Sequence, residues 1–265
     1  FMDISKNEKR TLYMIEQLAY RYSYSGNLKA SVYLFKQMIA LSPDNAKSAK
    51  FQYQIVQDFN TTGRVKSFRK ELSIWLDQFG ANSAWAETNK GNGKVIKENF
   101  DLQESTLRNS TLVLHQQALN ARTNYSKKLA AGSYKMYLTY FKGAKNYSEM
   151  LFFYGELLYD LQDYERAAAQ YERIALTDSK SKYFEKAVTN NVLAREKKLP
   201  SNKIIEARQK NLKNKTQKLQ LSPQVKNFER AALIYLKNFP KGEKSLEIRR
   251  RLGTIYYAHN QFDPA

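Results

Sequence analysis

The sequence contains no cysteine, and only five prolines and ten glycines interrupt its 265 residues. Without cysteine the chain forms no disulfide, offers no thiolate to a metal ion and has no cysteine nucleophile. Proline and glycine are the residues that most strongly interrupt helices, so their scarcity leaves long stretches free to be helical. Hydrophobic residues make up 42% of the chain, which is ample material for a core. We therefore expect a folded and mostly helical protein.

Histidine is also scarce, since His115 and His259 are the only two and are far apart in sequence. A zinc site would depend on carboxylates, and no nucleophile elbow accompanies either histidine. A glycine on each side of Asn92, followed by Lys94, lacks the spacing of a phosphate-binding loop. We predict no enzyme activity, no metal site and no cofactor. The rival, an enzyme hidden in residues 80–145, requires a deep polar pocket there.

Acidic residues are in deficit: 44 lysines and arginines face 25 aspartates and glutamates, giving a formal net charge of +19. Such a surface attracts polyanions in a salt-dependent way. Acidic proteins, anionic lipids and nucleic acids are therefore all candidate partners. No apolar run approaches the roughly 20 residues that span a bilayer, and residues 1–21 contain no recognisable secretory signal.

Apolar and small residues near the middle of the chain recur at the spacing of a helix-turn-helix repeat of about 34 residues. They are Leu151, Tyr154, Gly155, Leu158, Tyr164, Ala167, Tyr171 and Ile174. Related patterns occupy 15–43 and 252–265, and a weaker one occupies 55–76. Apolar positions at helical spacing continue through 100–141.

Between these patterns the sequence predicts two interruptions. The polar, glycine-containing stretch 80–98 is interpreted as a loop between repeats, and Gly132-Ser133 as a break between two helices. We accordingly divide the chain into repeats at 1–79, a divergent helical pair with a loop at 80–145, and repeats at 146–265.

These residues resemble the tetratricopeptide repeat family, most strongly at 15–43, 151–175 and 252–265. The resemblance implies an all-α superhelical solenoid of antiparallel helix pairs, with divergent repeats. The segments YGELLYDLQDYERAAAQYERIA and RLGTIYYAHNQFD also look like envelope-associated members found with gliding-motility and outer-membrane assembly systems of Gram-negative bacteria. That resemblance implies the periplasm or outer membrane, with the cytoplasm as the alternative. The chain starts on Phe1-Met2 and stops in mid-motif, so we expect a fragment whose signal or anchor lies outside it.

Members of this family bind peptides or partner domains on a concave face lined by the first helix of each pair. Carried onto this sequence, the resemblance places there Tyr13, Glu16, Tyr20, Tyr24, Glu149, Phe152, Glu156, Tyr159, Asp160, Arg250 and Tyr257. The resulting face is rich in tyrosine and partly acidic, which suits a bound protein segment. Alternatively, these tyrosines pack between neighbouring repeats. The implied function is a non-enzymatic scaffold, and no oligomeric state is predicted.

The steepest charge bias lies between Arg195 and Lys218, with a net charge of +7 over 24 residues. It falls where the turn within a repeat should be short, so we predict an insertion at 195–222. Its candidate polyanion-binding residues are Lys197, Lys198, Lys203, Arg208, Lys210, Lys213, Lys215 and Lys218. Without aromatic residues for base stacking, the stretch favours an anionic lipid or an acidic protein over nucleic acid. The alternatives are a solvated, mobile loop or a module that binds nucleic acid or lipid as its main function.

Overall fold

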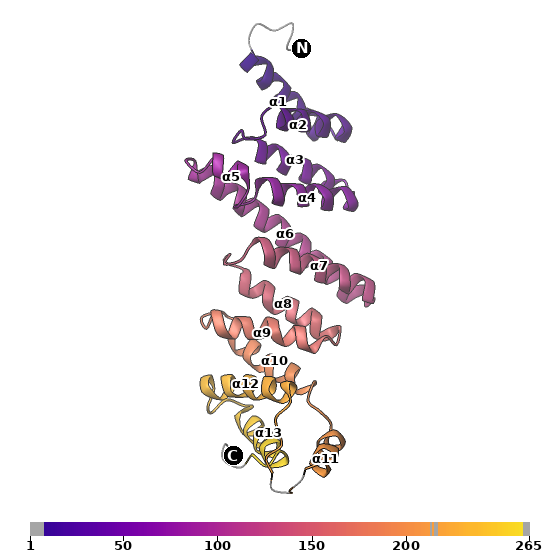
Figure 1. Cartoon of the computed structure of the whole chain (residues 1–265). Helices are drawn as coiled ribbons and strands as arrows, with labels where there is room; N and C mark the ends of the chain where they lie inside the picture. The colour runs from indigo at the N-terminus through magenta and orange to yellow at the C-terminus, as the bar shows by residue number, and fades with distance from the viewer. Residues whose placement is uncertain (1–7, 213, 215–216, 262–265) are drawn as a thin grey trace. The chain divides into compact units, whose positions relative to one another are not determined.

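The computed structural model of the chain describes residues 8–212, 214 and 217–261. This part of the chain consists of helices joined by turns and contains no β-strand (Figure 1). The helices are α1 (Glu8–Tyr24), α2 (Leu28–Leu41), α3 (Ser48–Thr61), α4 (Val65–Phe79), α5 (Ala84–Thr88), α6 (Gly93–Ala121), α7 (Asn124–Tyr140), α8 (Tyr147–Asp160), α9 (Tyr164–Thr177), α10 (Phe184–Glu196), α11 (Asn202–Lys210), α12 (Pro223–Asn238) and α13 (Ser245–Ala258). Consecutive helices pack in pairs, which confirms the predicted all-α, tetratricopeptide-like fold class.

The chain divides into two compact units, 1–110 and 111–265, with the boundary inside α6. The predicted boundaries after residues 79 and 145 separate groups of repeats and not compact units. They therefore stay a prediction. Phe262 and Ala265, which the motif assigns to the last repeat, lie outside the described residues.

In the first unit, α1 pairs with α2 and α3 pairs with α4. Gly26 makes the turn between α1 and α2 at φ +75°, a left-handed conformation that glycine adopts without strain. The Asn27 side chain then accepts a hydrogen bond from the Ala30 amide and caps α2. Phe35 and Ile55 are fully buried in the core between these helices. Gly26 and Asn27 therefore set the start of the second helix of the pair.

The loop predicted at 80–98 is wrong, because α5 and the first turns of α6 lie there. The polar side chains near this point have a structural role. Asn99 Nδ2 lies 2.6 Å from the Phe79 carbonyl oxygen, and Gln103 Nε2 lies 2.8 Å from that of Trp75. Both amides are buried, and Asn99 satisfies the Phe79 carbonyl group, which lies at the end of α4 and lacks a partner within the helix.

The helix break predicted at Gly132-Ser133 is also wrong, since α7 runs through both residues. The break lies at Arg122, whose φ of 52° ends α6, and at Thr123, whose side chain caps α7. Ser133 is instead buried, with its hydroxyl 2.6 Å from that of Thr111 on α6. The helix therefore ends at an arginine in the left-handed backbone conformation, and not at the predicted glycine ten residues later.

In the second unit, the motif glycine lets α8 and α9 pack closely. A Cβ added at Gly155 would lie 2.5 Å from the ring of Tyr171, which is fully buried. The connection is short because Gln162 adopts φ 60° and the Asp163 side chain caps α9 through the Arg166 amide. The motif spacing therefore predicted this helix pair for the correct physical reason.

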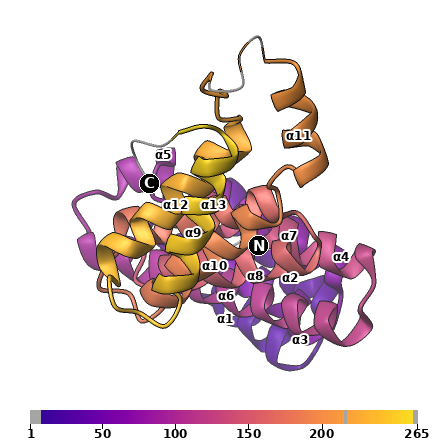
Figure 2. The same ribbon diagram turned by 90° about the horizontal axis from the view of Figure 1, so that it is seen from below.

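The next pair, α10 and α12, packs together although α11 lies between them in sequence. Val188 and Val192 of α10 share a buried core with Val225 and Phe228 of α12. Both views show α11 apart from the stacked helices of its unit (Figures 1 and 2). The chain after α11 returns along the end of α13, where the buried Leu219 donates its amide to a carbonyl oxygen 2.9 Å away.

Candidate partner-binding surface

The structure brings three of the predicted site residues together where α8 meets α10. Phe152 is 7% exposed, because the ring of Tyr183 stacks on it at a centroid distance of 4.8 Å. Glu149 accepts a hydrogen bond of 3.1 Å from the Tyr183 hydroxyl. Glu156 accepts a hydrogen bond of 2.8 Å from the side-chain amide of Asn190. These side chains therefore join neighbouring helix pairs.

The two remaining predicted residues of α8 lie at its C-terminal end. The half-buried Tyr159 ring meets that of Tyr164 edge-on at 5.0 Å. The exposed Asp160 forms an ion pair of 2.5 Å with Lys127 of α7. Both side chains contact adjacent helices and keep part of their surface open to solvent.

The other predicted residues lie on α1 and α13. In the first unit Tyr13 and Tyr24 are exposed, and Glu16 forms an ion pair of 2.7 Å with Lys47. Tyr20 is half-buried, and burial raises its pKa to about 12. The final two, Arg250 and Tyr257, are exposed on α13.

A half-buried aromatic surface borders this α8–α10 contact, and we call His115, Phe153 and Tyr183 the aromatic ledge. The rings of Phe153 and Tyr183 meet edge-on at 5.6 Å, and those of His115 and Phe153 at 6.3 Å. The Lys182 ammonium lies 4.9 Å from the centre of the Tyr183 ring. Sequence analysis missed Tyr183, which falls one repeat length after Glu149 and was therefore detectable by repeat spacing.

His115 is held within this ledge by a hydrogen bond. Its Nδ1 lies 2.6 Å from the Tyr134 hydroxyl. Burial lowers the pKa of His115, although the nearby carboxylates of Glu156 and Asp160 act in the opposite direction. Burial likewise raises the pKa of the Tyr134 hydroxyl well above its ordinary value. The pair is therefore neutral at neutral pH and suits contact with an uncharged part of a ligand.

An apolar cleft of about 340 Å³ lies between α10 and α13, and we call it the α10–α13 cleft. Its apolar lining consists of Val192, Leu193, Phe228 and Ile248. Charged side chains of both signs surround it, namely Glu196, Lys244, Glu247 and Arg251. Sequence analysis did not single out any of these eight residues as a site, because the cleft combines three helices.

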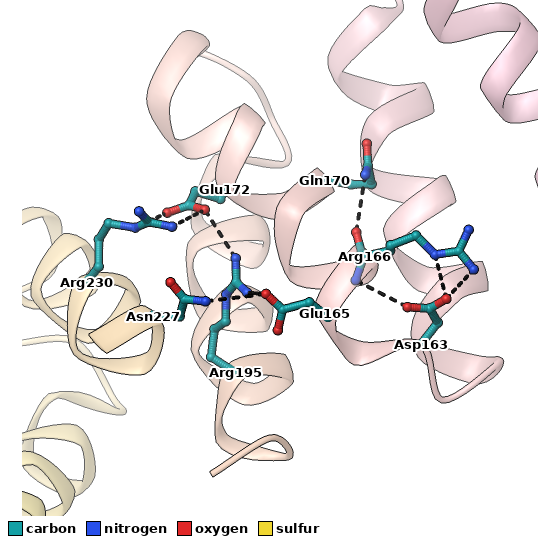
Figure 3. Close-up of polar contacts among 8 residues, drawn as sticks. All are labelled: Asp163, Glu165, Arg166, Gln170, Glu172, Arg195, Asn227 and Arg230. Carbon is teal, nitrogen blue, oxygen red and sulfur yellow. Dashed lines mark hydrogen bonds and ion pairs between the residues drawn. The ribbon is translucent and has the colours of Figure 1, made fainter. Parts of the chain in front are cut away.

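Arg195 begins the basic stretch but is buried in a polar network (Figure 3). Its side chain is 4% exposed and forms ion pairs with Glu165 and, at 3.3 Å, with Glu172 of α9. From α12, Arg230 Nε lies 2.7 Å from Glu172 Oε1, and the Asn227 amide lies 3.4 Å from Glu165. The network therefore ties α9, α10 and α12 together.

The predicted polyanion-binding residues lie on and around α11. Lys197, Lys198, Lys203, Lys210 and Lys218 are exposed. Arg208 is half-buried and donates a 2.9 Å hydrogen bond to the carbonyl oxygen of Gln220. The last two predicted residues, Lys213 and Lys215, lie outside the described residues.

Within the part of the chain that the structure describes, no cluster of three or more His, Asp or Glu side chains could hold a metal ion. Among the same residues, no helix has the length and apolar character needed to cross a membrane.

No protein-family model and no curated protein matches the chain. A similar solved structure is described as "Functional Characterization of Pseudomonas Aeruginosa pilF". It is 13% identical, the match covers 92% of this chain and 98% of that one, and the TM-score is 0.27. A likeness of that size supports no functional argument.

Proposed function

We propose that this chain is a non-enzymatic scaffold that holds a segment of a partner protein on the face made by α8, α10 and α13. The observation that supports this most is the α10–α13 cleft, whose apolar lining is buried except at Leu193. Leu193 keeps 37% of its surface exposed there. An apolar side chain inserted into such a cleft gains free energy by leaving water.

The exposed face of α10 links this cleft to the aromatic ledge. Tyr183 lies immediately before α10, and Asn190 and Leu193 follow at spacings of seven and three residues, so all three lie near one helical face. A partner segment lying across α10 reaches the ring of Tyr183 at one end and the cleft at the other. Aromatic rings with a polar tip suit such contacts because they bury large area with few rotatable bonds.

The rim of the cleft orients the partner rather than attracting it by net charge. Glu196 and Arg251 approach to 3.2 Å across the cleft, and Lys244 and Glu247 form a second pair at 3.1 Å. Opposite charges in balance give little long-range attraction but penalise a misplaced charge on the partner. We therefore expect binding at this face to survive high salt.

The test begins with affinity purification of the full-length protein from its own cells and identification of the bound proteins by mass spectrometry. With the purified partner, Leu193→Asp should weaken binding at least tenfold, because it places a charge in the apolar cleft. Leu233→Asp is the matched control, since Leu233 is 52% exposed on α12 and does not line the cleft. Both variants should keep the helical circular dichroism of the parent.

The rival function is binding of nucleic acid or anionic lipid through the exposed lysines of residues 197–218. Binding that disappears in 0.5 M salt and is unaffected by Leu193→Asp would favour this rival and contradict the scaffold.

Placement in a bacterial envelope, in motility or assembly, is a further part of the proposal, supported by the two sequence segments at 154–175 and 251–263. Cell fractionation with a protease-accessibility assay tests it. Recovery of the full-length protein in the cytoplasmic fraction alone would contradict it.

A further inference from the structure

We propose that the cleft between α11 and α12 binds an acidic protein segment, an extended peptide with several carboxylates. This cleft has a volume of about 1060 Å³ and is distinct from the α10–α13 cleft. Its charged lining consists of Arg208, Lys226 and Arg230, and its apolar lining of Leu221 and Pro223. No acidic residue lines it.

The cationic side chains lie on two walls of the cleft. Lys226 and Arg230 are four residues apart on α12, so they lie on one face of that helix. Arg208 comes from α11 and is positioned by its hydrogen bond to the carbonyl oxygen of Gln220. A chain lying between α11 and α12 can therefore meet positive charge on both sides.

Backbone contacts hold the wall that carries Gln220. The Leu219 amide donates to the His259 carbonyl oxygen at 2.9 Å, and the Gln261 side chain donates to the Leu219 carbonyl oxygen at 3.1 Å. On α11, Ile205 is buried, and the side-chain amide nitrogen of Gln209 lies 2.7 Å from the Ala258 carbonyl oxygen. The described part of the insertion is thus fastened to α13, which preforms the cleft.

The positive charge of the cleft is largely uncompensated. Lys226 forms no ion pair in the described part of the chain, and Arg208 contacts a neutral carbonyl group. Arg230 pairs with Glu172, but Glu172 is shared with the buried Arg195. Like charges collected in one cleft repel each other, and a ligand that brings carboxylates removes this repulsion. Arginine also binds carboxylates through two parallel hydrogen bonds.

The lining favours an acidic peptide over other anions. The volume far exceeds that of one phosphate group, and the cations come from two helices, α11 and α12. No aromatic side chain lines it, so bases have no stacking platform. A lipid surface presents its charge to a flat patch, whereas these cations line a cleft between two helices. Leu221 and Pro223 offer contact to an apolar side chain, which a peptide can supply.

The experiment measures fluorescence polarisation of a labelled peptide of about ten residues, roughly 30 Å when extended, with glutamates and interspersed leucines. The full chain should bind it, and should bind the same peptide with glutamine for glutamate at least tenfold more weakly. The double variant Arg208→Ala, Lys226→Ala should weaken binding at least tenfold. The matched control is Lys186→Ala, Lys237→Ala, which removes two exposed cations that do not line the cleft.

A single variant, Lys226→Glu, guards against misfolding because Lys226 is exposed, and it should also abolish binding. The proposal is overturned if the cleft variants bind like the parent or if the glutamine peptide binds equally well. It is also overturned if a single-stranded oligonucleotide, or vesicles of phosphatidylserine and phosphatidylcholine, bind more tightly through the same two residues. Leu193→Asp should leave binding of the acidic peptide unchanged, because Leu193 does not line this cleft. The proposed peptide site and the proposed scaffold face are therefore tested independently.

Discussion

A buried charge joins neighbouring helices in each unit, but the two charges have opposite sign. In the first unit, Asp58 of α3 accepts hydrogen bonds of 2.6 Å from the hydroxyls of Ser23 on α1 and Ser31 on α2. In the second unit, Arg195 of α10 reaches Glu165 and Glu172 of α9. Both charged side chains are buried, and each connects one helix pair to the next.

The difference lies in what neutralises each charge. Asp58 is surrounded by neutral donors, including the Gln54 amide at 3.0 Å, whereas Arg195 is surrounded by carboxylates. Hydrogen bonds from neutral donors to a buried carboxylate respond weakly to salt and depend on every donor being in place. Ion pairs respond to screening where their partners reach solvent, and Glu165 is 51% exposed. Similar helix packing is therefore secured by two chemically different devices.

Removing the buried cation should have the largest effect. Arg195→Met keeps most of the side-chain volume but leaves Glu172, which is 12% exposed, with Arg230 as its partner. We expect the free energy of unfolding to fall by about 2–3 kcal/mol, less than the 3–5 kcal/mol of a fully buried pair because Glu165 is half exposed. Urea denaturation followed by circular dichroism measures this change.

The matched control is Lys197→Met, next to the end of α10, where the side chain is exposed and the expected change is within about 0.5 kcal/mol. Equal stability of the Arg195→Met variant and the parent would mean that the network does not hold α9, α10 and α12 together.

Neutralising the buried anion should cost less. Asp58→Asn keeps one carbonyl oxygen as an acceptor but turns the other oxygen into a donor that faces a serine hydroxyl. We expect a loss of about 1–2 kcal/mol in the free energy of unfolding. The control, Asp101→Asn, breaks only an exposed pair with Lys97 and should cost below about 0.5 kcal/mol.

A double-mutant cycle with Ser31→Ala sharpens this result, because it isolates the coupling between that hydroxyl and Asp58. Independent effects of the two substitutions would show that the hydrogen bond contributes nothing to the link between α2 and α3.

The smallest expected effect concerns pH, which should act on the second unit because the first contains no histidine. The pKa of His115 is lowered in the folded chain, so the unfolded chain takes up its proton first, near pH 6.5. The free energy of unfolding should therefore fall as the pH drops below about 6.5, until the folded protein is also protonated.

Comparing the free energy of unfolding at pH 7.5 and 5.5 in the parent and in His115→Gln measures this contribution. The substitution should make the decline shallower. An identical decline in both proteins would assign it to other groups.

Much of the fold was predictable because its determinants are local. Gly155 and Tyr171 lie at the repeat spacing, and their contact is the one that this spacing requires. The two wrong predictions, the loop at 80–98 and the helix break at 132–133, concern residues whose role depends on partners distant in sequence. Asn99 looks like a loop residue but satisfies a carbonyl group of α4, and Arg122 ends a helix without glycine.

The candidate sites were less predictable because they combine helices. The basic run in the sequence ends at Lys218, whereas the cleft adds Lys226 and Arg230 from the next helix. Two basic residues four apart on a predicted helix were a detectable signal. Phe152, predicted on the binding face, has little exposed surface because Tyr183 covers it, and no property of Phe152 itself indicates this.

Residues 197–222 show that the pairing of α10 with α12 tolerates a long detour of the chain. Doubling the length of a flexible connection costs only about 0.6 kcal/mol in closure entropy, which a well-packed helix pair can absorb. The connection between α10 and α12 is therefore a suitable place to insert a foreign segment. A recognition loop, a protease site or a small reporter domain placed there should leave the packing of α10 against α12 intact.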